Sequence, residues 1–315
     1  MSSVMDVTIR GESGSNIRAV LKLYDRRFGR DLRQILGKHA PHTSADEVAF
    51  QDFVRQGRMT SFLEELQETK RTSLIHPQPY YVLGDPPYTP EDKAKFEAAL
   101  WQECDEYFDC ETEVYSRLED LQGKSIPRLY AHVRLVSRDS DAPRELLQPQ
   151  MARYFDVKGI LVELIPGYNL WDLATSPLAP QDRGTWPALV QSAVDAAHHI
   201  NTRGVIMNDC APRNVMVKQA DSQTPFIIDF AQCWFKDRLI NLWEDIGLGD
   251  EDSEDEEEWN PDVEYCERLH DSSNPAAIGA VMTTLVLRAT GMKLDIKYPD
   301  YDMIIDGIKR GKTAR

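Results

Sequence analysis

The segment Gly204-Val-Ile-Met-Asn-Asp209-Cys-Ala-Pro-Arg-Asn214-Val-Met-Val217 contains an aspartate and, five residues later, an asparagine that opens an apolar stretch. A second apolar stretch, Phe226-Ile-Ile228, ends directly at Asp229-Phe230. Both stretches have the length and composition of short buried strands. Asp and Asn alone are common in turns, where their side chains bond to nearby backbone. The helical pattern before this loop and the place of Asp229 at a strand end favour a ligand site.

This order of residues resembles the catalytic loop and the metal-binding motif of protein kinases. In phosphoryl transfer one carboxylate orients the acceptor hydroxyl, while a carboxamide and a second carboxylate hold Mg²⁺ against the phosphates. The resemblance therefore implies that Asp209 orients the acceptor and that Asn214 and Asp229 bind the metal. It implies ATP and Mg²⁺ as cofactors.

The same resemblance predicts a lysine on an early strand, and Val20-Leu-Lys22-Leu has the apolar-Lys-apolar form. A phosphate is a fitting partner for an ammonium group between inward-facing apolar residues. The alternative is an edge-strand lysine that faces water. On the next helix we predict Glu111 as the partner of Lys22, because apolar residues follow it at +3, +4 and +7. Glu113 is the alternative partner.

Two further segments complete the predicted nucleotide site. Gly11 and Gly14 lie in a turn between two predicted strands, where backbone N–H groups would approach phosphate without a Cβ in the way. Any tight hairpin also favours glycines. The stretch that ends Glu163-Leu-Ile165-Pro-Gly167 resembles the hinge of kinases, in which Glu163 and Ile165 would give backbone hydrogen bonds to adenine. A plain buried strand is the alternative for this stretch.

Three segments in a fixed order, 21–28, 115–127 and 209–217, resemble the fungal protein-kinase-like family, over roughly residues 7–30 and 108–247. The resemblance implies an α+β, bilobal protein-kinase-like fold. It implies a small antiparallel-sheet N-lobe over 1–165 and a larger, mainly helical C-lobe over 166–315. About residues 29–107 form an insertion between the lysine strand and the glutamate helix. Aminoglycoside and choline phosphotransferases share this fold, so the acceptor stays open between a protein and a small-molecule hydroxyl.

The sequence departs from typical protein kinases at two motifs. Met207-Asn208-Asp209 stands where those kinases have His-Arg-Asp, and Asp229-Phe-Ala231 where they have Asp-Phe-Gly. We therefore do not expect regulation by activation-loop phosphorylation. Two readings follow: an active ATP:acceptor phosphotransferase that retains all five polar positions, and a pseudokinase that binds nucleotide as a scaffold without catalysis.

Charge and composition limit the partners. A net charge of −16 argues against a nucleic-acid binder, since phosphate backbones repel acidic surfaces. Eight carboxylates lie within residues 249–258, which predicts an extended, solvated segment or a docking surface for a basic partner. The five scattered cysteines fit a reducing compartment, and no apolar run long enough to cross a membrane occurs. We expect a cytoplasmic or nuclear protein with no membrane contact.

Apolar periodicity predicts the main elements. The predicted strands span residues 4–10, 17–24, 126–136, 159–165, 215–217 and 226–228. The predicted helical segments span residues 44–70, 89–121, 186–201 and 275–290, the second of them with Thr89 as its N-cap.

Overall fold

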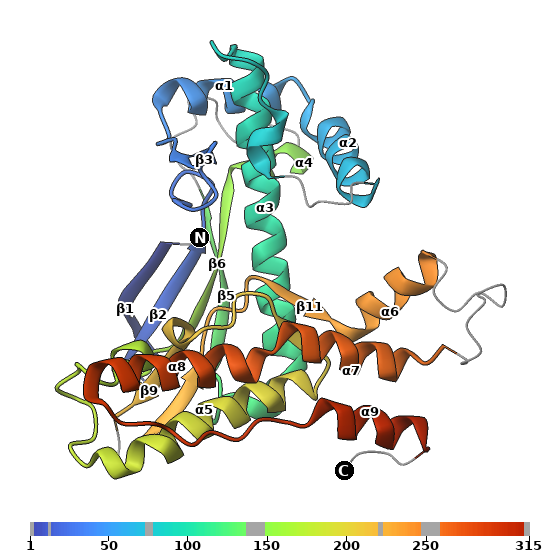
Figure 1. Ribbon diagram of the computed structural model, residues 1–315. Helices are drawn as coiled ribbons and strands as arrows, with labels where there is room; N and C mark the ends of the chain where they lie inside the picture. Colours follow the sequence, from blue (N-terminus) through green and yellow to red (C-terminus); the bar gives the residue numbers. More distant parts are fainter. Residues whose placement is uncertain are drawn as a thin grey trace. The chain divides into compact units, whose positions relative to one another are not determined.

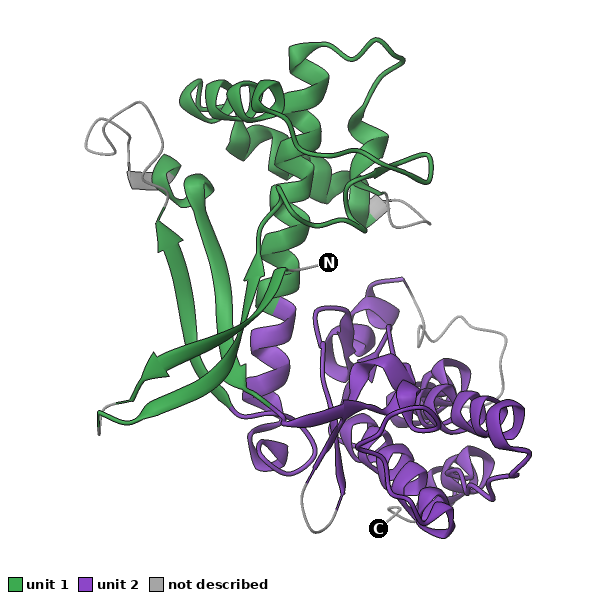
Figure 2. Ribbon diagram, turned by 90° about the vertical axis from the view of Figure 1, so that its left-hand side faces the viewer, with its two compact units in different colours: residues 1–109, 129–164 green, residues 110–128, 165–315 purple. Residues whose placement is uncertain are grey.

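The computed structural model describes residues 3–11, 14–72, 78–136, 149–219, 223–246 and 259–311. The chain divides into two compact units, which Figure 2 shows in different colours. The first unit comprises residues 1–109 and 129–164, and the second comprises 110–128 and 165–315. Residues 110–128, which the sequence analysis assigned to the N-lobe, thus cluster with the second unit. The acidic segment 249–258, with the docking surface predicted for it, lies outside the described residues.

An antiparallel four-stranded sheet forms the β part of the first unit, in the order β1-β2-β6-β5 (Figure 1). Its strands are β1 (Ser3–Arg10), β2 (Asn16–Tyr24), β5 (Leu129–Val136) and β6 (Asp156–Glu163). The inner strands β2 and β6 carry most of the buried residues, whereas β1 and β5 are largely exposed edges. These four strands were predicted from sequence within three residues at each end, and the antiparallel sheet is confirmed.

Short helices fill the region predicted as an insertion. The elements there are β3 (Gln34–Ile35), β4 (Lys38–His39), α1 (Ser44–Arg55), α2 (Met59–Thr72) and the 3-10 turn η1 (Pro79–Val82). In Figure 1 these helices gather at the N-terminal half of the long helix α3, together with α4 (Pro149–Ala152). The segment predicted as helical over 44–70 is thus two helices. The chain turns between them at Gly57, which has a positive φ of 72°.

Helix α3 (Pro90–Arg117) is one unbroken helix of 28 residues. Thr89 caps it as predicted: the Asp92 N–H donates to Thr89 Oγ1 (3.2 Å), and the Asp92 carboxylate accepts the Thr89 N–H (2.9 Å). The helix begins at residue 90, so the last part of the predicted insertion is already the helix that carries Glu111. The insertion proper is therefore shorter than residues 29–107.

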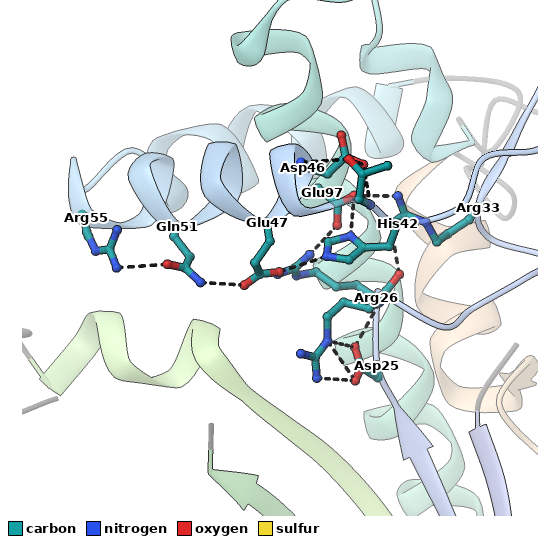
Figure 3. Close-up of polar contacts among 11 residues, drawn as sticks. Asp25, Arg26, Arg33, His42, Asp46, Glu47, Gln51, Arg55 and Glu97 are labelled. Carbon is teal, nitrogen blue, oxygen red and sulfur yellow. Dashed lines mark hydrogen bonds and ion pairs between the residues drawn. The ribbon is translucent and has the colours of Figure 1, made fainter. Parts of the chain in front are cut away.

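A buried ionic cluster fixes this helical region to α3 (Figure 3). Glu97 of α3 has no exposed surface and binds the guanidinium groups of Arg26 and Arg33, the latter at 2.7 Å. Arg26 also pairs with Glu47 of α1, and its guanidinium lies 3.8 Å from the ring centroid of Phe50. Two acids and two arginines thus compensate one another, as buried charges require.

His42 joins the two acids of this cluster. Its Nε2 lies 3.2 Å from a Glu47 oxygen and its Nδ1 lies 3.4 Å from a Glu97 oxygen. Burial alone would raise the pKa of Glu97, but the hydrogen bond with His42 and the charges of Arg26 and Arg33 outweigh it and lower that pKa to about 2. Burial alone would lower the pKa of His42, and its bonds to Glu47 and Glu97 raise it above its ordinary value.

The second unit is mainly helical, and its described residues form two short sheets, β10-β9-β7 and β11-β8. Its helices are α5 (Trp186–Asn201), α6 (Lys236–Asp245), α7 (Pro261–Ser272), α8 (Asn274–Thr290) and α9 (Tyr301–Lys309). Its strands are β7 (Gly167–Asn169), β8 (Val205–Met207), β9 (Val215–Lys218), β10 (Thr224–Ile227) and β11 (Cys233–Phe235). Helix α5 packs on α8 and on β10, and α7 packs on α9. Helices α5 and α8 confirm the predicted helices within one residue.

The close approach of β7 to β9 requires a glycine. The two strands pair antiparallel, with Gly167 opposite Lys218. A Cβ built on Gly167 would lie 1.8 Å from the main-chain oxygen of Val217. No other residue fits there without a shift of backbone.

No helix in the described part of the chain is both long enough and apolar enough to cross a membrane. The observed class is α+β, with an antiparallel sheet in one unit and mostly helices in the other.

Candidate functional site

The loop that carries Asp209 starts from a buried and well-anchored strand. Strand β8 pairs antiparallel with β11, and the Asn208 N–H donates to the Gln232 oxygen (2.9 Å). Asn274, at the start of α8, accepts the Met207 N–H (2.9 Å) and donates to the Met207 oxygen (2.7 Å). These bonds fix the main chain two residues before Asp209.

Asp209 and Asn214 are brought together by the short 3-10 turn η7 (Pro212–Asn214). The side-chain amide of Asn214 donates to the Asp209 main-chain oxygen (2.7 Å) and to its carboxylate (3.3 Å). Both bonds are made by the amide nitrogen of Asn214 and not by its amide oxygen. Arg213, which the sequence analysis did not assign, binds the other carboxylate oxygen of Asp209. The carboxylate of Asp209 is thus held from two sides.

Asp229 lies two residues after the end of β10, directly after Ile228, which is hydrogen-bonded to Asn214. Strands β9 and β10 pair antiparallel. Just beyond their last residue pair, the Ile228 N–H donates to the main-chain oxygen of Asn214 (2.9 Å). Asp229 has a φ of 69°, which is uncommon for a residue other than glycine. Backbone strain of this kind clusters at functional sites.

Glu111 is buried in the second unit, with only 2% of its surface exposed. Burial and the charges of Glu111 and Asp229 raise the pKa of Tyr115 well above its usual value, so both carboxylates lie near this tyrosine. The alternative candidate Glu113 is engaged elsewhere, because it pairs with Arg117 (2.6 Å) and with Arg238. Of the two glutamates, Glu111 is therefore the one inside the fold.

Lys22 lies on β2, a central strand of the sheet in the first unit, and only 6% of it is exposed. Its register partners are Val4 on one side and Ile160 on the other. Its ammonium lies 5.5 Å from the ring centroid of Tyr24. An exposed lysine on an edge strand, the alternative from sequence, does not describe this residue.

Gly11 and Gly14 lie at the far end of the β1–β2 hairpin from Lys22. The register pairs Arg10 with Asn16 at that end, six residues along β2 from Lys22. Six residues of strand span about 20 Å, more than a lysine side chain and a triphosphate bridge comfortably. This register argues against Gly11 and Gly14 covering a phosphate that Lys22 contacts.

Glu163 and Ile165 lie at the end of the first unit and the start of the second. Glu163 is the last residue of β6, pairs with Ala19 and is 9% exposed. Ile165 is buried, and the next residue, Pro166, accepts the Gln219 N–H through its main-chain oxygen (2.8 Å). Their assignment to adenine stays a prediction.

His42, Asp46 and Glu97 have ligand atoms close enough together to share a metal ion. The two carboxylates already have other partners. Glu97 binds two arginines, and the Asp46 carboxylate accepts the Thr43 N–H (2.9 Å) in the cap of α1. We assign this group a structural role.

Comparisons with known proteins add little to this geometry. No protein-family model matches the chain, and no curated protein matches it. A solved structure of WaaP in complex with acyl carrier protein matches 57% of this chain and 76% of its own, at 18% identity and a TM-score of 0.30. A similarity of this size assigns neither a family nor an activity. The class that the fold defines is an α+β protein with an antiparallel sheet.

Proposed function

We propose that this protein is an ATP- and Mg²⁺-dependent phosphotransferase with a bilobal protein-kinase-like fold, related to the fungal protein-kinase-like family. It would move the γ-phosphoryl group of ATP to a hydroxyl of a protein or small-molecule acceptor. The sequence segments at 21–28, 115–127 and 209–217 support the family assignment. The geometry within the second unit supports the chemistry.

The observation that carries this proposal is the hydrogen bond from the Ile228 N–H to the main-chain oxygen of Asn214 (2.9 Å). It brings the residue before β9 and the residue after β10 to the same end of one hairpin. Asn214 and Asp229 there offer a carboxamide and a carboxylate oxygen. Mg²⁺ prefers such oxygen ligands and usually completes its shell with water and phosphate.

Asp209 suits the acceptor role because its carboxylate is oriented but not enclosed. Arg213 and Asn214 bind one oxygen each, and 30% of the side chain is exposed. A carboxylate in this state can accept a hydrogen bond from an incoming hydroxyl. Lys22 and Glu111, both buried charged residues, are the proposed phosphate-binding lysine and its partner glutamate.

The proposal is tested by thermal unfolding with ATP and Mg²⁺, added separately and together. A ligand at a hundredfold excess over its Kd stabilises the native state by about 2.7 kcal/mol. We expect a rise in melting temperature that needs both ligands and is lost in Asp229→Ala. The exposed Asp302 on α9 gives the control Asp302→Ala, which should keep the rise. A parent protein with no ATP-dependent rise would contradict the proposal.

A nucleotide-binding scaffold without catalysis is the second candidate. The distance between the glycine turn and Lys22 favours it, because no glycine-rich cover for the phosphates is identified in the described residues. The two candidates differ in ADP formation. Slow Mg²⁺-dependent formation of ADP that disappears in Asp209→Asn supports the phosphotransferase, and ATP binding without any ADP formation supports the scaffold.

A further inference from the structure

Cys110 and Cys233 lie against each other in the second unit, although 123 residues separate them in sequence. Cys110 is on α3, directly before Glu111, and Cys233 begins β11, four residues after Asp229. The Cys110 sulfur accepts the Cys233 N–H (3.3 Å) and lies 3.5 Å from the main-chain oxygens of Phe230 and Cys233. One thiol thus touches the backbone of the other residue.

The surroundings hold this contact in place. One helical turn beyond Glu111, Tyr115 packs edge-on against Phe230, with ring centroids 5.7 Å apart. Tyr115 and Phe230 are both fully buried. Strand β11 is itself fixed to β8. The two cysteines therefore meet at a packed junction between α3 and the segment that follows Asp229.

The two thiols differ in their chemistry. The hydrogen bond that the Cys233 thiol offers, together with its main-chain N–H, lowers the pKa of Cys110, although burial opposes this. Burial and the hydrogen bond to Cys110 raise the pKa of Cys233. Thiolates are the nucleophiles in disulfide exchange, and a thiol of lowered pKa that keeps some exposure reacts first. Cys110 is only partly buried, so it is the thiol that attacks.

We propose that Cys110 and Cys233 form a reversible disulfide, with a small disulfide such as oxidised glutathione as the oxidant. The Cys110 thiolate attacks one glutathione sulfur, and a mixed disulfide forms as one glutathione leaves. The Cys233 sulfur then attacks Cys110, and the second glutathione leaves. The two thiol protons end on the two glutathione molecules, so one disulfide is reduced while one is formed.

The disulfide would tie the helix of Glu111 to the segment of Asp229. Its effect on nucleotide binding rests on the proposed function, whereas its formation does not. The Cys110 sulfur already contacts the main chain of Cys233 in the reduced protein, so the cross-link would lock the present arrangement. A bond that closes a loop of this length restricts the unfolded chain strongly, and we expect the oxidised protein to melt at a higher temperature than the reduced one.

The full-length protein is equilibrated in buffers of increasing ratio of oxidised to reduced glutathione, then alkylated, digested and analysed by mass spectrometry. We expect a peptide pair that joins Cys110 to Cys233, reversal by dithiothreitol, and a rise in melting temperature on oxidation. The pair and the rise should both be lost in Cys110→Ala and in Cys233→Ala. The buried Cys104 and Cys266 provide controls. Cys104→Ala and Cys266→Ala should keep both the joined peptide pair and the rise in melting temperature on oxidation.

Three results would contradict the proposed disulfide. They are no joined peptide pair in excess oxidant, a joined pair that forms only in urea, and a fall in melting temperature on oxidation. Failure of the proposed function is read separately. If ATP and Mg²⁺ do not raise the melting temperature of the reduced protein, the proposed nucleotide site is wrong. The proposed disulfide, which mass spectrometry detects, is unaffected by that result. If the oxidised protein shows the same ATP-dependent rise as the reduced one, the disulfide stands without control of that site.

Discussion

The side-chain amide of Asn274 hydrogen-bonds to both main-chain groups of Met207, at 2.9 Å to the nitrogen and 2.7 Å to the oxygen. Asn274 also accepts from the Asn201 amide (2.8 Å), and all three residues are buried. The start of α8 therefore holds the strand that leads to Asp209.

Asn274→Leu should destabilise the protein and weaken the Asp209 loop. It leaves the polar groups of Met207 without their partner, and each buried group left unsatisfied costs about 1–3 kcal/mol. Urea denaturation gives the loss of unfolding free energy. An unchanged midpoint for Asn274→Leu would show that these hydrogen bonds contribute nothing.

Glu97→Gln should be among the most destabilising single changes in the first unit. It removes the charge that compensates Arg26 and Arg33, and breaking a buried ion pair in this way costs about 3–5 kcal/mol. The matched control is Glu91→Gln on the same helix, since the Arg58–Glu91 pair is 42% and 39% exposed. Exposed pairs contribute about 0–1 kcal/mol. Equal losses in the two variants, measured by denaturant unfolding, would contradict a structural role for the buried cluster.

The stability of the first unit should depend on pH on both sides of neutrality. The pKa of Glu97 is lowered to about 2 from 4.5, so its contribution is present above pH 4.5 and is lost as the pH falls towards 2. The pKa of His42 is raised from 6.5, so its contribution is present below pH 6.5 and is lost as the pH rises through the folded-state value. Both contributions are intact between pH 4.5 and 6.5.

Unfolding free energies measured across this range test the sign of both effects. In His42→Gln the decline above pH 6.5 should flatten, while the acid decline due to Glu97 remains. His39→Gln, a change of an exposed histidine on β4, should keep the profile of the parent. A parent profile without any decline above pH 6.5 would contradict the role of His42 as a protonated bridge.

Gly167→Ala should destabilise the second unit, because the new Cβ meets the Val217 oxygen. Overpacking of this kind costs about 1–3 kcal/mol, and more where only backbone can move. The control is Gly84→Ala, where a Cβ would lie 3.7 Å from the nearest atom, a side-chain oxygen of Asp92. Thermal unfolding of the two variants gives the comparison, and a similar melting temperature for both would show that β7 and β9 separate without cost.

Much of the fold could be predicted because its elements carry clear local signals. Helix α5 has an apolar face of the right period, and its observed bounds, Trp186–Asn201, are those predicted from sequence. Thr89 and Asp92 form the N-terminal cap of α3, so the start of that helix was predicted from a local signal as well. Helices α6, α7 and α9 were not predicted, because many charged residues interrupt their apolar periodicity or flank the acidic segment.

The candidate site was predictable only where its residues are neighbours in sequence. The spacing of Asp209 and Asn214 placed both on one loop. The contacts around these residues come from far away: Asn274, which holds the strand before Asp209, is 67 residues from Met207, and Cys233, in the segment after Asp229, is 123 residues from Cys110. Such pairings depend on how helices pack, which no local pattern encodes. The hairpin of β1 and β2 was predicted from sequence, and its register shows that the turn with Gly11 and Gly14 lies at the end away from Lys22.

The most direct test of the central claim is a calorimetric titration of the protein with ATP, in Mg²⁺ and again in EDTA, for the parent and for Asp229→Asn. We expect the parent to bind ATP at least tenfold more tightly in Mg²⁺ than in EDTA, a difference of about 1.4 kcal/mol. In Asp229→Asn this difference should disappear while the protein stays folded. ATP affinity that is the same with and without Mg²⁺ in the parent, or the same Mg²⁺ effect in Asp229→Asn, would contradict a metal site at Asn214 and Asp229.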